Sequence, residues 1–332
     1  MRSAYSKAAN RDAVRVQIVS GVSRPGNSSV TEWETQYLSY IGGYTLSSEP
    51  IAFRAVMAGS KTKALMSQAE ELYVRIVTRL IKEKVIDSST HILVACGGVT
   101  DHNALIRAGL TNCVISNLDS RQKGDEFLPL AWSYQDAEAL TYPDDAFDFC
   151  IVHEGLHHCR SPHLAIKEML RVSRRGILII EPADNIFTAM GVKIGIGQEY
   201  EQAAVYGNDL RFGGVRNTCI PNYVYRFTAE EIRKTVRCLK PESQLKFTFS
   251  FHFVAPWSAL LMRKSGLRLL SVMTMRPLFF LLHRMLPHVF ANQVVALVIK
   301  PSGLEGLQPW LRREGDRIEV NNDWFAARYA RR

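Results

Sequence analysis

Between residues 91 and 182, short apolar segments of strand type alternate with segments of helical periodicity. Such alternation predicts a parallel sheet with helices on both faces, because parallel strands require long crossover connections. The chain is therefore expected to have an α/β fold. The expected strands lie at 91–96, 113–118, 131–135, 147–153 and 176–181, and the expected helices between them lie at about 102–109 and 162–173.

Elements on either side of this region extend the predicted domain. Apolar residues from Leu65 to Ile81 recur at helical spacing and predict an amphipathic helix before the first strand. Thr228 and Glu231 predict the start of a helix that ends near residue 239. The last expected strands lie at 245–253 and 293–299.

We divide the chain into an N-terminal helical and lid region at 1–87, a sheet domain at 88–301 and a C-terminal tail at 302–332. Two insertions interrupt the sheet domain. Residues 183–224 are rich in glycine and tyrosine and lack periodicity, which is typical of a lid or binding loop. Residues 255–290 are strongly apolar but contain too many arginines to leave a span of about 18 uncharged residues for crossing a bilayer. Residues 255–290 could form a buried core segment, a homodimer interface or a peripheral membrane contact, and the sequence leaves these three alternatives open.

Composition narrows the setting of the protein. The six cysteines form no CxxC pair, and several lie in apolar strands, so we expect reduced thiols in a cytoplasmic protein. Lys and Arg number 41 against 32 Asp and Glu, a net charge of +9. The basic residues form no stripe interleaved with aromatics, and we expect no nucleic-acid partner.

Residues 153–157 read His-Glu-Gly-Leu-His and match the pattern in which two imidazoles on one helix bind zinc. His163 stands where a third ligand falls in the longer form of that pattern. However, the apolar run 147–152 before His153 is of strand type, whereas the zinc pattern requires a helix. A zinc hydrolase using His153, Glu154 and His157 therefore stays as an alternative, beside a structural role for these histidines.

An ordered series of motifs carries a family resemblance. It consists of the glycine turn at 95–98, Asn117 and Asp119 after the second strand, Asp136-Ala137-Glu138 after the third, and Leu156-His157-His158 after the fourth. This series resembles the class I S-adenosylmethionine-dependent methyltransferases, in the branch that methylates small molecules, sugars and lipids. The likeness is specific over residues 88–182 and looser out to 300.

The resemblance implies a Rossmann-like, mostly parallel seven-stranded sheet, S-adenosyl-L-methionine as cofactor and no metal ion. The glycine turn would contact the methionine part of the cofactor, and Asp136 would contact its adenine. For the ribose hydroxyls, spacing favours Asn117 and chemistry favours Asp119, so that assignment stays open. The implied cofactor-binding residues are Ala95, Gly97, Gly98, Asn117, Asp119, Asp136, Ala137, Glu138, His153 and Glu154.

The sequence also departs from the family pattern. Ala95 replaces the usual first glycine of the turn, and Val99 stands where another glycine often occurs. A noncatalytic scaffold that kept the methyltransferase fold is therefore a further hypothesis.

The acceptor is expected to be a small molecule, a sugar or a glycan precursor that is methylated on oxygen. A hydroxyl acceptor benefits from a base near neutral pH, and His157 or His158 is the candidate. Arg211, Arg216 and Arg226 could pair with a phosphate or carboxylate and so suggest a phosphorylated acceptor. A membrane contact by 255–290 would suggest a lipid-linked one. The residues predicted to bind the acceptor are Tyr200, Tyr206, Arg211, Asn217, Tyr223 and Arg226.

Overall fold

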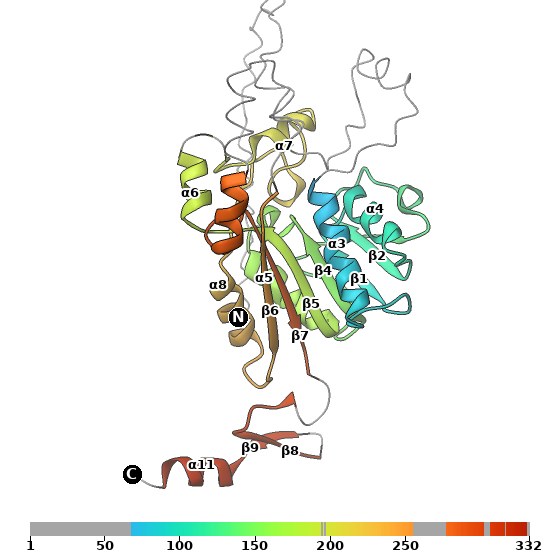
Figure 1. Ribbon diagram of the computed structural model, residues 1–332. Coiled ribbons are helices and arrows are strands. Elements are labelled where there is room, and N and C mark those ends of the chain that lie inside the picture. The colour runs from blue at the N-terminus through green and yellow to red at the C-terminus, as the bar shows by residue number, and fades with distance from the viewer. Residues whose placement is uncertain are drawn as a thin grey trace, which may run out of the picture.

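The computed structural model describes residues 68–330, apart from 194, 196, 255–276, 302–305 and 316. One seven-stranded sheet, in the order β3-β2-β1-β4-β5-β7-β6, forms its centre (Figure 1). Strands β1 to β5 pair in parallel, and β7 runs antiparallel between β5 and β6. The predicted α/β fold with a mostly parallel seven-stranded sheet is confirmed. The strands are β1 (Ile92–Ala95), β2 (Cys113–Asn117), β3 (Ala131–Tyr134), β4 (Phe147–His153), β5 (Ser173–Pro182), β6 (Lys246–His252) and β7 (Gln293–Ile299).

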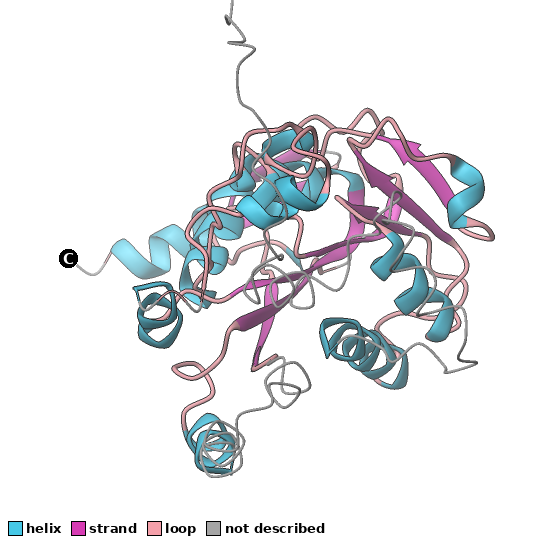
Figure 2. Cartoon of the chain, turned by 90° about the horizontal axis from the view of Figure 1, so that it is seen from above, coloured by secondary structure: helices cyan, strands magenta, loops and turns pink. Residues whose placement is uncertain are grey.

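Helices cover both faces of the sheet (Figure 2). Because side chains alternate along a strand, β1 contributes to two cores. Ile92 and Val94 pack with α3 (Gln68–Lys82) and α4 (Val99–Arg107), whereas Leu93 and Ala95 pack with α5 (Pro162–Val172) and α8 (Ala229–Leu239). The predicted amphipathic helix before β1 is thus present as α3, and its apolar stripe belongs to the same core as the sheet.

Local capping sets where these helices begin. Ser161 and Thr228 accept hydrogen bonds from the backbone N–H groups three residues later, at the starts of α5 and α8. Both starts lie where the sequence predicted them. Helix α4 begins at Val99, earlier than expected, because the Gly98 N–H donates to the Asp101 carboxylate at 2.8 Å and closes the first turn.

Two segments contain more structure than the sequence predicted. Residues 183–224, which we call the lid segment, include α6 (Ile186–Lys193), α7 (Gln202–Gly207) and the short 3-10 helix η3 (Val215–Asn217). The C-terminal region forms a hairpin of β8 (Leu311–Glu314) and β9 (Arg317–Val320), followed by α11 (Asn322–Tyr329). Elements this short span too few turns to show clear periodicity. Two further 3-10 turns are η1 (Gly124–Phe127) and η2 (Leu156–His158).

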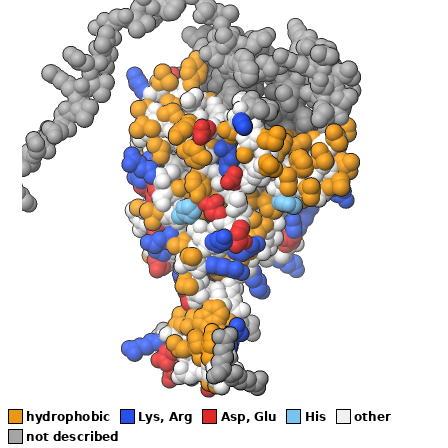
Figure 3. Space-filling view, turned by 90° about the vertical axis from the view of Figure 1, so that its left-hand side faces the viewer, with side chains coloured by type: hydrophobic (Ala, Val, Ile, Leu, Met, Phe, Trp, Pro, Cys, Tyr) orange, Lys and Arg blue, Asp and Glu red, His pale blue; other side chains and the backbone are white. Residues whose placement is uncertain are grey.

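Part of the apolar insertion lies at the surface. Residues 277–285 form a helix beside α6, with aromatic contacts between Phe187 and Phe279. Figure 3 shows hydrophobic side chains gathered on this face of the molecule. Residues 255–276 lie outside the described part of the chain. No helix among the described residues is long and apolar enough to span a bilayer. The exposed apolar residues of α6 and of residues 277–286 are Ile186, Met190, Leu278, Phe280, Leu281, Met285 and Leu286.

Candidate active site

The loops that follow the parallel strands meet at the carboxyl edge of the sheet. In the first of them, a Cβ atom added to Gly97 would lie 2.7 Å from Cγ1 of Val94, so close packing against β1 requires glycine there. A Cβ added to Gly98 would meet no atom within 4 Å. The turn therefore presents open space beside backbone groups at the start of α4, which suits an approaching ligand.

The two candidate ribose ligands occupy different surroundings. The Asn117 amide donates to the Gly97 carbonyl at 2.6 Å and so lies against the glycine turn. Both carboxylate oxygens of Asp119 are held by Arg121, at 2.8 and 2.7 Å. Burial opposes ionisation of Asp119, but Arg121 outweighs it and lowers the pKa of that carboxyl. Asn117 and Asp119 both lie at the carboxyl edge of the sheet, and both remain candidates for binding the ribose hydroxyls.

At the end of β3, two carboxylates contact the lid segment. Arg216 of η3 lies 2.5 Å from Asp136 and 3.0 Å from Glu138. Glu138 also accepts hydrogen bonds from the backbone N–H groups of Arg160 and Ser161, just before α5. Glu138 thus joins the lid segment to α5, while Ala137 between the two carboxylates is buried.

The residues at the end of β4 do not form the zinc pattern suggested by the sequence. His153 is the last residue of β4, and its ring stacks on Tyr73 at 4.7 Å between centroids. Glu154 accepts a hydrogen bond from Gln293 at 2.6 Å. His157 lies in η2, so the two histidines are not one turn apart on a helix. The alternative hypothesis of a zinc site made by His153, Glu154 and His157 is wrong for this reason.

His157 lies between two carboxylates. Its Nδ1 is 2.8 Å from Oε2 of Glu181, a residue with no exposed surface at the end of β5. The other oxygen of Glu181 accepts the backbone N–H groups of Gly155 and Leu156, both at 2.7 Å. Glu181 therefore fixes both the η2 turn and the orientation of the His157 ring.

Glu201, just before α7, faces both histidines. Its Oε2 lies 3.4 Å from Nε2 of His157 and 3.4 Å from Nε2 of His158. Burial lowers the pKa of His158, whereas at His157 the two carboxylates outweigh burial and raise the pKa well above its usual range. Burial also disfavours the Glu201 carboxylate, yet His158 and His157 lower its pKa to about 2.

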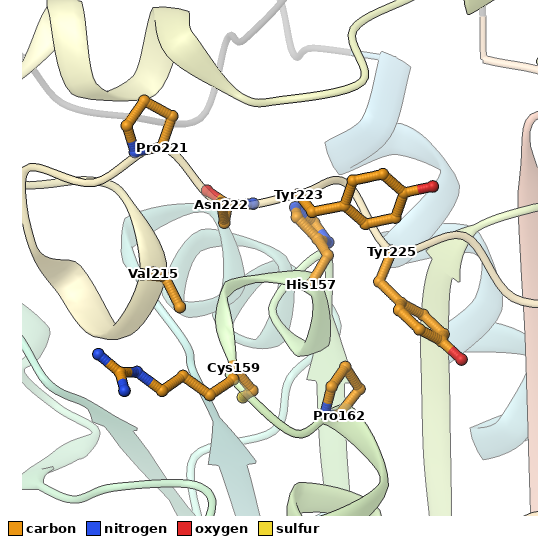
Figure 4. Close-up of a pocket in the computed structure, with 9 residues that line it drawn as sticks. His157, Cys159, Pro162, Val215, Pro221, Asn222, Tyr223 and Tyr225 are labelled. Atoms are coloured by element: carbon orange, nitrogen blue, oxygen red, sulfur yellow. The ribbon is translucent and has the colours of Figure 1, made fainter.

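Two cavities lie beside this cluster. The first, of about 330 Å³, is bounded by η2, the start of α5 and the lid segment (Figure 4). The second, of about 400 Å³, includes residues of α6 and α8. Tyr223 and Tyr225 line both. The first cavity is lined by His157, Cys159, Arg160, Pro162, Val215, Pro221, Asn222, Tyr223 and Tyr225, and the second by Asp184, Ala189, Val192, Glu199, Tyr223, Tyr225, Arg226 and Glu231.

Only part of the predicted acceptor set reaches these cavities. Tyr223 and Arg226 line them, whereas Tyr200, Tyr206, Arg211 and Asn217 are not among the lining residues. Asn217 instead shapes the lid segment, where its side chain accepts from the Gly213 N–H and donates to the Leu118 carbonyl.

Glu181 and Glu201 were not among the site residues predicted from the sequence. A charge at the end of an otherwise apolar strand was the available signal for Glu181. Glu201 had none, because it lies in a segment without periodicity.

Residues 93–180 match the family model described as a methyltransferase domain. The match runs from β1 to β5 and includes the glycine turn, Asp136 and the two histidines of η2. The chain carries a methyltransferase domain over residues 93–180. The predicted family, enzyme class and cofactor of the methyltransferase are thereby confirmed. No curated protein matches the chain.

Solved structures similar to the methyltransferase include the YcgJ protein from Bacillus subtilis, 14% identical, with coverage of 69% of this chain and 99% of that one and a TM-score of 0.42. Another is magnesium protoporphyrin IX methyltransferase from Synechocystis with bound SAH, 14% identical, with coverage of 80% and 95% and a TM-score of 0.43. At these scores the two structures support no statement about the acceptor.

The residues at the carboxyl edge fit S-adenosylmethionine. The space beside Gly98 would be filled by a side chain at a position where the family binds the methionine part. Asn117, Asp119 and Asp136 supply the amide and carboxylate groups that ribose hydroxyls and an adenine amino group require. The cofactor supplies a methyl group already activated on a sulfonium, so the protein has mainly to align the acceptor with it.

Proposed function

We propose that the methyltransferase methylates a hydroxyl of a neutral small molecule, sugar or glycan precursor bound beside η2. The observation that carries this proposal is the cavity of about 330 Å³ with His157 in its wall. His157 and His158 are the proposed catalytic residues, which contact the hydroxyl and accept its proton as neutral imidazoles. The lowered pKa of His158 favours that form, whereas His157 reaches it only above its raised pKa. Glu181 holds the ring of His157, so its Nε2 keeps one direction.

Charges in the second cavity disfavour a phosphate group there. Its lining contains Asp184, Glu199 and Glu231 against a single arginine, Arg226. Arg226 already donates to the backbone carbonyls of Val224 and Gln198. Arg216, another of the three arginines expected to bind a phosphate, is paired with Asp136 and Glu138.

An apolar tail on the acceptor is also part of the proposal. Ala189 and Val192 of α6 line the second cavity, whereas Ile186 and Met190 of the same helix are exposed. The helix thus joins the cavity to the apolar surface formed with residues 277–285. A lipid-linked acceptor could remain at a membrane surface while its head group enters the cavity. The free cysteines support placing this contact at a cytoplasmic membrane face.

A transfer assay tests the proposed reaction. Protein is incubated with S-adenosylmethionine carrying a labelled methyl group and with free sugars, lipid-linked glycans, sugar phosphates or RNA. We expect transfer to neutral hydroxylated acceptors, faster with a lipid tail, and none to RNA. If S-adenosylhomocysteine binds but no acceptor is labelled, the noncatalytic scaffold becomes the better hypothesis.

The proposed adenine contact of Asp136 makes a separate prediction. We expect Asp136→Ala to weaken S-adenosylhomocysteine binding about 10- to 100-fold, because a hydrogen bond to a charged group is lost. Calorimetric titration measures the affinity. Asp144→Ala is the matched control, since the Asp144 side chain is 75% exposed and pairs with Arg171. Equal affinities of the two variants would contradict the assignment.

A further inference from the structure

Three possible ligand atoms from η2 and the lid segment lie close together. Nε2 of His157 and Nε2 of His158 are each near Oε2 of Glu201, and the three residues can offer one ligand atom each within 4.8 Å of one another. We propose that His157, His158 and Glu201 bind a divalent transition-metal ion, with zinc as the best fit. Its role in methyl transfer rests on the proposed function, whereas binding of the ion does not.

The separations are longer than a charge-assisted hydrogen bond and match two ligands that share one ion. Each histidine nitrogen lies 3.4 Å from the Glu201 oxygen. Two ligand atoms at about 2.0 to 2.1 Å from a tetrahedral zinc ion are about 3.4 Å apart. A charge-assisted N–H···O bond would instead be about 2.7 to 2.9 Å long. Both histidine–Glu201 distances thus match the spacing of ligands around one ion, and the set stays within 4.8 Å.

Two of the three ligands, His157 and Glu201, are each held by a second group, as in known metal sites. Nδ1 of His157 bonds to Glu181 at 2.8 Å, which directs Nε2 toward Glu201. The Asn222 amide donates to Oε2 of Glu201 at 3.1 Å. A carboxylate behind a ligating histidine fixes the ring and raises its basicity. Glu181 and Asn222 therefore orient the proposed ligands without contacting the ion.

The ligand types and the surroundings indicate the chemistry. Two imidazoles and one carboxylate form a common ligand set for catalytic zinc, which leaves a position for water or substrate. His157 and Asn222 line the first cavity, so that position faces the proposed acceptor (Figure 4). An ion there would bind the acceptor oxygen and lower its pKa. Under this inference the imidazoles act as ligands of the ion that activates the hydroxyl.

Metal binding can be measured without knowing the acceptor. Full-length protein freed of metal by a chelator is titrated with zinc in a calorimeter and with cobalt in a visible spectrophotometer. We expect one ion per chain and the absorption bands of four-coordinate cobalt. His158→Ala and Glu201→Gln should each weaken zinc binding at least about 100-fold, since each removes a direct ligand. His163→Ala, which changes a histidine paired with Glu231 outside the cluster, should bind zinc as the unchanged protein does.

The outcomes separate this inference from the proposed function. S-adenosylhomocysteine affinity and thermal melting of each variant report whether it is folded. Absence of zinc binding by the unchanged protein, or equal zinc affinity in folded Glu201→Gln, overturns the metal site. Zinc binding that requires Glu201 and His158 supports the site even if no methyl transfer is found. Full transfer by chelator-treated protein overturns the role of the ion in activation.

Discussion

Replacing Glu181 by alanine is expected to lower the free energy of unfolding by about 3 to 5 kcal/mol. The Glu181 side chain has no exposed surface and accepts from two backbone N–H groups and from His157. Alanine would leave all three donors buried without this acceptor. Each unsatisfied buried donor costs about 1 to 3 kcal/mol. Urea unfolding of the full chain measures the loss.

Two further variants distinguish this mechanism from a general effect of removing a glutamate. Glu181→Gln retains an oxygen for the two amide groups, so its loss should be clearly smaller than that of Glu181→Ala. Glu230→Ala removes a side chain that is 53% exposed and paired with Arg233, and should cost less than about 1 kcal/mol. If Glu181→Ala unfolds at the same urea concentration as Glu230→Ala, the carboxylate does not hold the η2 turn.

The parts of the fold that could be predicted are those fixed by local chemistry. The expected strand at 147–153 has the same bounds as β4, because an apolar run interrupted only by Asp148 ends where polar residues begin. Thr228 predicted the start of α8 because its hydroxyl caps the helix within the same turn. Parallel pairing followed from the alternation of strands and helices, and the family motifs then identified the cofactor.

The proposed active-site cluster could not be predicted in the same way, because its members meet only after long-range packing. Glu181 is separated from His157 by the whole of α5, and Arg216 reaches Asp136 from η3. No local periodicity encodes such pairs. The literal His-Glu-x-x-His pattern misled for the related reason that spacing implies a shared helix face only if the segment is a helix. Here His153 ends a strand.

Glu181 also explains why one site can serve both folding and chemistry. Its carboxylate stabilises the turn that follows β4 and directs the ring of His157 at the first cavity. A test of the proposed function must therefore remove the reactive nitrogen of His157 while retaining the bond to Glu181.

His157→Asn is designed to do this. The asparagine amide can occupy the position of Nδ1 and donate to Glu181, but nothing replaces Nε2. We expect the rate of methyl transfer to the acceptor found in the transfer assay to fall at least about 100-fold. S-adenosylhomocysteine affinity and the urea midpoint should change little, because His157 is not among the predicted cofactor-binding residues and the asparagine retains the bond to Glu181. Single-turnover transfer with a labelled methyl group measures the chemical step itself.

Asp144→Ala provides the control for this measurement. The Asp144 side chain is 75% exposed, pairs with Arg171 and lines neither cavity, so its removal should leave the transfer rate within about twofold, as expected for a surface substitution. Transfer by His157→Asn within about tenfold of the unchanged enzyme would contradict the proposed role of His157. A loss confined to His157→Asn, with the cofactor still bound, would place the activation of the acceptor at the carboxyl end of β4. Both proposed routes of activation, direct proton transfer and ligation of an ion, require Nε2 of His157 there, and zinc titration of the same variant then distinguishes them.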